Sequence, residues 1–129
     1  MSSVHLITGA KHTGKTETAK KIALQRNALL LSVKETAFHF YGTSATDEQI
    51  NQARAYIWNL SESIVSAGGA VVIDDTLESV SLRQDAFNRA KMFAEYVTFH
   101  QIKKSVADDA SYTPISSDEK YDDVLYYRY

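Results

Sequence analysis

Apolar and polar residues alternate along the chain in two different rhythms. Short continuous apolar runs are typical of buried strands, and they occur at Val4–Thr8, Ala28–Leu31, 70–75 ("AVVIDD") and Val97–Ile102. Between these runs, apolar residues recur every three or four positions, which predicts amphipathic helices. Because strands that alternate with helices build parallel sheets, we expect an α/β fold with a mostly parallel sheet and helices on both of its faces.

Capping residues and glycines indicate where the helices begin and end. The segments Lys15–Arg26 and Lys34–Tyr41 are expected to be helical, and Gly42 ends the second one. Thr46 and Gln49 form a capping-box pattern that opens the longest helix. The apolar stripe of that helix consists of Ile50, Ala53, Ile57, Leu60, Ile64 and Ala67, and it ends before Gly68 and Gly69.

The last long helix is expected to start at a second capping-box pattern, formed by Ser81 and Gln84. Its inward face would then consist of Leu82, Ala86, Ala90 and Phe93.

The sequence changes character beyond Lys104, where it becomes polar and acidic and contains the only proline. We expect one domain over residues 1–129, in which about 103–120 form a lid-like or irregular segment. The ending "DVLYYRY" fits either a short docking helix or an edge strand.

Composition narrows the class of protein. The hydrophobic share of 44% and the charged share of 23% are those of a globular domain, and the net charge of −2 gives no general attraction to nucleic acid or to anionic membranes. The absence of cysteine excludes disulfides, cysteine–zinc sites and thiol catalysis. The four histidines show no metal-ligand spacing. No apolar stretch approaches 18 residues, and no secretory signal pattern begins the chain, so we expect a soluble cytoplasmic protein with no membrane contact.

A glycine-rich loop between the first strand and the first helix carries the strongest chemical signal. Gly9, Gly14, Lys15 and Thr16 match the pattern G-x-x-x-x-G-K-[ST]. Glycines allow backbone N–H groups to surround phosphate oxygens, and the following helix presents its positive end to the anion. The lysine reaches the β- and γ-phosphates, and the threonine hydroxyl is a Mg²⁺ ligand. The loop predicted to bind the nucleotide is Gly9, Ala10, Lys11, His12, Thr13, Gly14, Lys15 and Thr16.

Two acids, Asp74 and Asp75, follow the third apolar run. A carboxylate at the end of a neighbouring strand can hold Mg²⁺ directly or through water. The sequence therefore predicts a site for ATP or GTP with Mg²⁺, held by Thr16 together with Asp74 or Asp75.

The chain resembles the small P-loop kinases with an AAA-type ATP-binding domain, a group that includes bacteriophage polynucleotide kinase and zeta-toxin-like kinases. In "VVIDDTLESVSLRQDAF", Asp75 and Thr76 match that group's strand-Asp-Thr segment. Thr113–Pro114 and the ending "DVLYYRY" resemble the proline and the last helix that follow its lid. The resemblance implies a three-layer P-loop NTPase fold and Mg·ATP-dependent phosphoryl transfer to a hydroxyl or to a phosphorylated small molecule.

The sequence departs from that group on the acceptor side. Lys34 stands where the group has its catalytic aspartate, and Ala37 replaces the arginine that grips the acceptor phosphate. A lysine is ordinarily protonated at neutral pH, so it does not accept a proton from an acceptor hydroxyl. Glu35, which falls on the neighbouring acid, or Asp75 would then act on the acceptor side, with Lys15 as the third catalytic residue.

The expected lid segment also contains few basic residues. The group's arginine-rich lid, which offsets charge on the transferred phosphoryl group, is represented here by Lys103, Lys104 and either Arg83 or Arg128.

The leading hypothesis is a small ATP-dependent kinase that acts on a nucleoside, a nucleotide or a metabolite. Long nucleic acid is disfavoured as a substrate, because an acidic segment would repel its backbone. That segment contains Asp108, Asp109, Asp118, Glu119, Asp122 and Asp123. The alternatives are a catalytically weakened kinase relative, acting as a nucleotide-binding regulatory module with a protein partner, or a simple NTPase.

Overall fold

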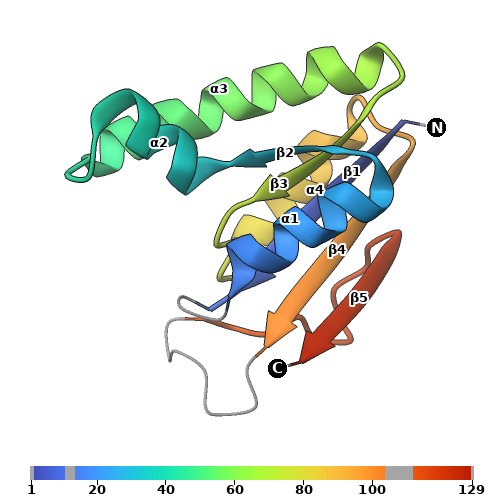
Figure 1. The fold of residues 1–129 in the computed structure, drawn as a ribbon. Coiled ribbons are helices and arrows are strands. Elements are labelled where there is room, and N and C mark those ends of the chain that lie inside the picture. Colours follow the sequence, from blue (N-terminus) through green and yellow to red (C-terminus); the bar gives the residue numbers. More distant parts are fainter. Residues whose placement is uncertain (1, 11–13, 104–111, 129) are drawn as a thin grey trace.

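A computed structural model describes residues 2–10, 14–103 and 112–128 of the chain (Figure 1). In this part of the chain, strands of one five-stranded sheet lie in the order β2-β3-β1-β4-β5, and every neighbouring pair is parallel. The strands are β1 (Ser3–Gly9), β2 (Leu29–Ser32), β3 (Ala70–Asp74), β4 (Tyr96–Lys103) and β5 (Asp123–Arg128).

Helices cover both faces of this sheet, as the alternation of strands and helices predicts (Figure 1). They are α1 (Lys15–Arg26), α2 (Val33–Tyr41), α3 (Asp47–Ser66) and α4 (Val80–Lys91). Helix α1 packs on one face, whereas α3 and α4 pack on the other. The three-layer α/β fold expected from the sequence is therefore confirmed.

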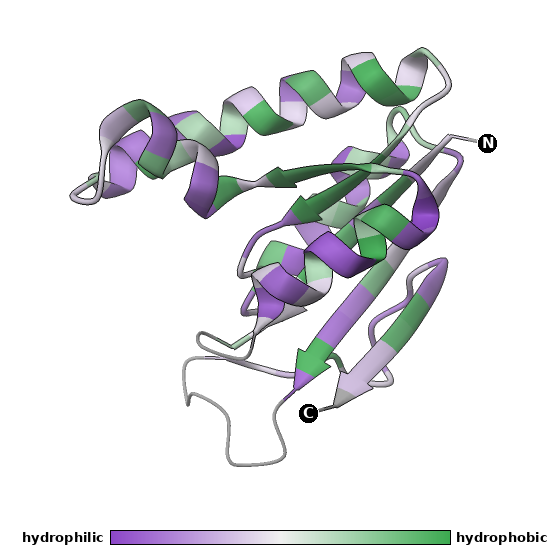
Figure 2. Ribbon diagram, viewed as in Figure 1, coloured by the Kyte–Doolittle hydropathy of each residue, from purple (hydrophilic) through white to green (hydrophobic). Residues whose placement is uncertain are grey.

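The core follows from the period-two alternation of side chains along the strands. In β1, Val4 and Leu6 point to the face covered by α3 and α4, whereas Ile7 points to the face covered by α1. Strands β2 and β3 are mostly hydrophobic, as expected for buried strands of a parallel sheet, whereas β4 also carries hydrophilic residues, among them the buried Thr98, His100 and Gln101 (Figure 2).

The predicted helix boundaries agree closely with the structure for the first three helices. Gly14 precedes α1 with φ 76°, a left-handed conformation that glycine adopts without steric cost. The Ser32 side chain accepts a hydrogen bond from the backbone N–H of Glu35 at the start of α2. The capping box of Thr46 and Gln49 is present at the start of α3, and it is confirmed in both directions, at 3.2 and 3.0 Å.

The predicted start of the fourth helix is wrong by two residues. The N-cap is Ser79, whose side chain accepts from the backbone N–H of Leu82, and not Ser81. Ser79 is the earlier of the two serines and captures the first unsatisfied N–H groups, so the helix begins at Val80. In the structure Leu82 is 46% exposed and does not belong to the inward face, whereas Arg83 is buried in the core beside Ala86 and Ala90.

The C-terminal segment forms the edge strand β5, which decides between the two alternatives that the sequence left open. The last helix of the resembled kinases is not what residues 123–128 form. Side chains of β5 alternate in period two, with Val124 against the core on the α4 side and Tyr127 against the core on the α1 side. This pattern suits a strand that has core on both faces.

None of the helices in the described ranges is both long and apolar enough to cross a lipid bilayer.

Candidate functional site

The parallel sheet brings the ends of three strands to one edge. Asp74 lies opposite Ile7 in the register of β1 and β3, and opposite Ser32 in the register of β2 and β3. The loops that follow β1, β2 and β3 therefore meet at this edge, which is where open α/β sheets bind ligands. Asp74 and Asp75 are both buried there.

Lys15, Thr16 and Asp74 form the first half of the site. The Thr16 hydroxyl donates a 2.7 Å hydrogen bond to Oδ2 of Asp74, and Nζ of Lys15 lies 3.3 Å from Oδ1 of the same carboxylate. The residues predicted to bind phosphate and Mg²⁺ at the end of the glycine-rich loop therefore contact the predicted acidic residue at the end of the third strand. Side-chain exposure is 16% for Lys15 and 2% for Asp74, so this ion pair is partly shielded from water.

The end of β1, where the glycine-rich loop begins, is held by hydrogen bonds to the segment that follows β3. The Thr8 hydroxyl donates to the carbonyl of Leu77 at 2.8 Å, and the backbone N–H of Gly9 lies 3.5 Å from the carbonyl of Thr76. Ala10 is buried, and Gly14 leads into α1. The loop residues Lys11, His12 and Thr13 lie outside the described residues.

Arg54 and Asp75 form the second half of the site. Nε of Arg54 donates to Oδ2 of Asp75 at 2.6 Å, and Nη2 donates to Oδ1 at 3.1 Å, which is a two-pronged guanidinium–carboxylate pair. Nη1 donates to Oδ1 of Asn51 at 2.6 Å. The hydrogen bonds to Asp75 raise the pKa of the Arg54 guanidinium above its ordinary value. Asp75 also accepts from the backbone N–H of Thr76 at 2.8 Å.

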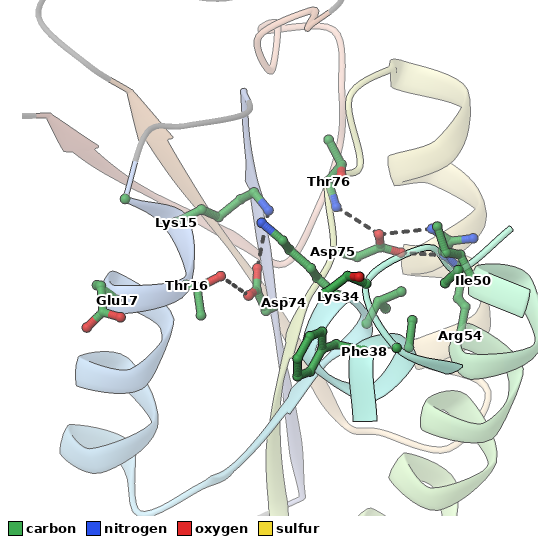
Figure 3. Close-up of a pocket in the computed structure, with 16 residues that line it drawn as sticks. Lys15, Thr16, Glu17, Lys34, Phe38, Ile50, Arg54, Asp74, Asp75 and Thr76 are labelled. Carbon is green, nitrogen blue, oxygen red and sulfur yellow. Dashed lines mark hydrogen bonds and ion pairs between the residues drawn. The ribbon is translucent and has the colours of Figure 1, made fainter. Parts of the chain in front are cut away.

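A cavity of about 630 Å³ opens between these two halves (Figure 3). Its walls come from the start of α1, the length of α2, the first half of α3 and the end of β3. It combines an apolar surface with charged groups, which is the usual make-up of a small-molecule site. The lining residues that carry the argument are Lys15, Lys34, Phe38, Arg54, Asp74 and Asp75.

Of the acceptor-side residues considered in the sequence, Lys34 and Ala37 line the cavity and Glu35 does not. Lys34 lines the cavity, and Figure 3 shows its side chain extending across it. Ala37, which stands where the resembled kinases have an arginine, is 3% exposed and lines the same wall. Glu35 does not line the cavity. Its carboxylate lies 3.7 Å from the ammonium group of Lys20 and is 56% exposed.

The candidate lid residues are also dispersed. Arg83 is fully buried, and its guanidinium donates to both carboxylate oxygens of Glu119 at 2.9 and 3.0 Å and to the carbonyl of Leu77 at 3.0 Å. Burial opposes its charge, but the hydrogen bonds to Glu119 outweigh that effect and raise the pKa of Arg83. Arg83 is therefore a wrong prediction as a group that offsets phosphoryl charge, because it is buried and fastens Glu119, within the segment expected to be lid-like, to α4.

The remaining basic residues of the expected lid contribute little to the site geometry. Lys103 ends β4 and does not line the cavity. Lys104 and the acidic pair at 108–109 lie outside the described residues, and so does the side chain of Arg128.

The donor set around Asp74 suits a hard cation. Mg²⁺ prefers oxygen ligands and is usually bound through one or two protein oxygens, with phosphate and water completing the shell. The hydroxyl of Thr16 and the carboxylate of Asp74 supply such oxygens within 2.7 Å of one another. No group of three or more histidine, cysteine or acidic side chains is gathered for a metal in the described ranges, so this site would rely on the phosphates of a nucleotide.

Arg54 is the site residue that sequence reasoning missed. It lies one residue after Ala53 and four after Ile50, and therefore at the margin of the apolar stripe of α3. A charged side chain on that margin, in a helix packed against a sheet, was the signal that could have drawn attention to it.

Comparison with known proteins supports the fold. No protein-family profile and no curated protein matches the sequence at a significant level. Among solved structures, a candidate kinase from Chloroflexus aurantiacus is similar with a TM-score of 0.69 and 18% identity, over 80% of this chain and 59% of that one. A chain of the Pnkp1/Rnl/Hen1 complex gives 0.76 and 16%, over 95% and 46%. APS kinase of Mycobacterium tuberculosis gives 0.61 and 13%, over 97% and 85%.

These similarities define the class of fold, which is that of the P-loop kinases, as the glycine-rich loop and the resemblance indicate. The chain spans about half the length of the first two of these structures.

Proposed function

We propose that this protein binds a nucleoside triphosphate with Mg²⁺ and transfers its γ-phosphoryl group to a small acceptor. The observation that carries the proposal is the meeting of Lys15 and Thr16 with Asp74 at the mouth of a cavity large enough for a second small molecule. A phosphoryl donor and an acceptor both need room at one edge of the sheet, and this arrangement provides it.

Each residue of the first half has a role that follows from its chemistry. Lys15 would exchange its contact with Asp74 for the β- and γ-phosphates, because two anions of higher charge attract an ammonium group more strongly than one carboxylate does. Thr16 and Asp74 would hold Mg²⁺, which neutralises charge on the phosphates when it is bound. The first turn of α1 would present its backbone N–H groups to the same phosphates.

ATP, rather than GTP, is the donor we favour, because one of the structurally similar proteins, Kti12 of Chaetomium thermophilum, was solved with ADP-AlF3. The acceptor is proposed to be small because the cavity of about 630 Å³ is the size of a small-molecule site.

Thermal unfolding with and without Mg·ATP and Mg·GTP tests the nucleotide site. A ligand at one hundred times its dissociation constant stabilises the folded state by about 2.7 kcal/mol. We expect this shift in the natural protein and its loss in Lys15→Ala, with Lys21→Ala on the same helix as the matched control. Absence of a shift at millimolar nucleotide would rule out the proposed function.

A second candidate is a weakened kinase relative that binds nucleotide and acts as a regulatory or interaction module. The observation that favours it is the pairing of Lys34 and Ala37 at the acceptor-side positions, where the resembled kinases carry an aspartate and an arginine. The variant Lys34→Asp with Ala37→Arg separates the two candidates. A large gain in phosphoryl transfer to hydroxyl acceptors, from a natural protein that shows transfer to no acceptor, would favour the weakened relative.

A further inference from the structure

The carboxylates that line the described part of the cavity are all engaged. Asp74 is held by Lys15 and Thr16, and Asp75 receives hydrogen bonds on both oxygens from Arg54. The third, Glu17, lies 3.4 Å from the ammonium group of Lys20 on the surface of α1, and Figure 3 shows it pointing away from the cavity.

This arrangement is poorly suited to an acceptor that attacks through a hydroxyl group. A hydroxyl must lose a proton as it attacks, and a positioned base normally receives that proton. Asp75 instead holds Arg54 in place, because Oδ1 accepts hydrogen bonds from Arg54 and from the backbone N–H of Thr76, and Oδ2 accepts one from Arg54. Lys34, at the position where the resembled kinases have their base, brings a cation.

The same wall is well equipped to hold an anion. Among the described residues, each nitrogen of the Arg54 guanidinium donates one hydrogen bond, which leaves Nη1 and Nη2 one further N–H each. The Arg54 side chain is 36% exposed, and Asp75 fixes its orientation. Lys34 is exposed, and within the described residues its ammonium group forms no ion pair. The two cations come from α3 and α2 and line one cavity.

An apolar surface lies beside these cations. Phe38 is 58% exposed and lines the cavity together with Ile50 and Ala37. An exposed aromatic ring in a cavity wall can stack on a flat ring of a ligand. The wall therefore suits a molecule with an anionic end and a planar or apolar body.

We propose that the acceptor is a phosphate monoester with a planar body, such as a nucleoside monophosphate, and that its phosphate oxygen, held by Arg54 and Lys34, is the attacking atom. This inference rests on the proposed phosphoryl transfer and gives it a substrate class.

The chemistry balances without a base. A phosphate monoester is largely a dianion at neutral pH, because its second pKa is about 6. One of its oxygens forms a bond to the γ-phosphorus of the nucleoside triphosphate. The bond between that phosphorus and the β,γ-bridging oxygen breaks, and the nucleoside diphosphate leaves with the electron pair. The product is a phosphoanhydride, and no proton has to be removed from the nucleophile.

Matched acceptors test which oxygen attacks. Phosphoryl transfer from Mg·ATP is measured with the four common nucleosides, with their 5′-monophosphates, and with 2′,3′-dideoxynucleoside 5′-monophosphates, which have no free hydroxyl. We expect transfer to at least one monophosphate and to its dideoxy form, no transfer to the nucleosides, and a phosphoanhydride signal in the ³¹P spectrum of the product.

Variants of the two cations test the binding groups. We expect Lys34→Met and Arg54→Gln each to raise the KM for the monophosphate by roughly tenfold or more, since a charge-assisted hydrogen bond is lost. The KM for ATP should stay unchanged in both. Lys34 is exposed, so its variant should fold even if Arg54→Gln leaves Asp75 unpaired and destabilises the protein. Arg89→Gln on the exposed side of α4 is the matched charge control.

The outcomes also separate this inference from the proposed function. Transfer to nucleosides but not to dideoxy monophosphates would overturn the inference and leave the kinase function standing. Intact nucleotide binding with no transfer to any acceptor of the panel would overturn it as well. Loss of nucleotide binding itself would overturn both.

Discussion

Asp74 and Asp75 are neighbours in the chain, yet they serve opposite sides of the cavity. Asp74 contacts Lys15 and Thr16 at the start of α1, whereas Asp75 contacts Arg54 in the middle of α3. Successive residues of a strand point to opposite faces of a sheet, and α1 and α3 cover opposite faces here. The end of β3 is thus a single element that supports both sides of the cavity, which we propose to be a phosphate side and an acceptor side.

The two sides differ in how their residues are held. On the phosphate side, the residues that meet Asp74 follow each other in one loop and the first turn of one helix. On the acceptor side, Lys34 and Arg54 come from two helices, and the nucleotide motif places no constraint on either. The comparison teaches that one edge of a sheet can join a side built from neighbours in the chain to a side assembled from two separate helices.

The largest effect is expected from breaking the second arginine–carboxylate pair among the described residues. Arg83 and Glu119 have side chains that are 0% and 2% exposed, whereas Arg54 is 36% exposed. Removing one partner of a buried pair costs about 3–5 kcal/mol, because the other charge stays buried. We expect Arg83→Met to lose that much in urea unfolding, and Arg54→Met to lose less, because the Arg54 side chain is 36% exposed although that of Asp75 is 8% exposed.

The matched measurement is the unfolding midpoint of both variants, with the slope of the transition as a check on two-state behaviour. Equal losses would mean that Arg54 is part of the structural scaffold rather than of the acceptor side.

Low pH is expected to destabilise the sheet that supports both sides of the cavity, and so to weaken ligand binding on both sides together. His5 and His100 are hydrogen-bonded at 2.9 Å, and His100 is hydrogen-bonded to Tyr127 at 2.8 Å. Burial lowers the pKa of His5 from 6.5 to about 4 and that of His100 to about 3. Their contribution is complete above pH 6.5 and is lost as the pH falls toward 4, because the unfolded chain binds the protons first.

His5 alone should account for about 3 kcal/mol of this loss. Urea unfolding between neutral pH and pH 4 measures it, and His5→Gln with His100→Gln should flatten the pH dependence. The affinities for the nucleotide and for the acceptor should decrease together as the pH falls. Loss of one side at a pH where the other is intact would show that the sheet is not the shared element.

The smallest effect, and the sharpest for the comparison, is expected from the two neighbouring aspartates. Asp74→Asn should reduce the Mg²⁺-dependent part of nucleotide stabilisation by about 1–2 kcal/mol, since a charged ligand of the cation is lost. Asp75→Asn should leave that quantity unchanged. It should instead raise the KM for the anionic acceptor, because Arg54 loses the group that orients it.

Nucleotide titrations by calorimetry and acceptor titrations by steady-state kinetics give the two quantities. If both variants weaken the same ligand, then the division of the cavity into two sides is wrong.

Much of the fold could be predicted from the sequence. The helix Lys15–Arg26 and the capping box of Thr46 have the predicted bounds, because both depend on residues close together in the chain. The start of α4 could not be placed as well, since two serines compete and burial of Arg83 favours the earlier one. The form of residues 123–128 was open, because a strand at a sheet edge is decided by pairing with β4.

The candidate site divides in the same way. The glycine spacing with Lys15 and Thr16 predicts a phosphate-binding loop, because each role there belongs to a residue type at a fixed distance along the backbone. Only the tertiary structure decided that Arg54 meets Asp75, that Glu35 turns away from the cavity, and that Arg83 is buried. Arg54 and Asp75 are 21 positions apart in the chain, and Arg83 and its partner Glu119 are 36 positions apart. Local spacing in the sequence carries no information about contacts between residues so far apart.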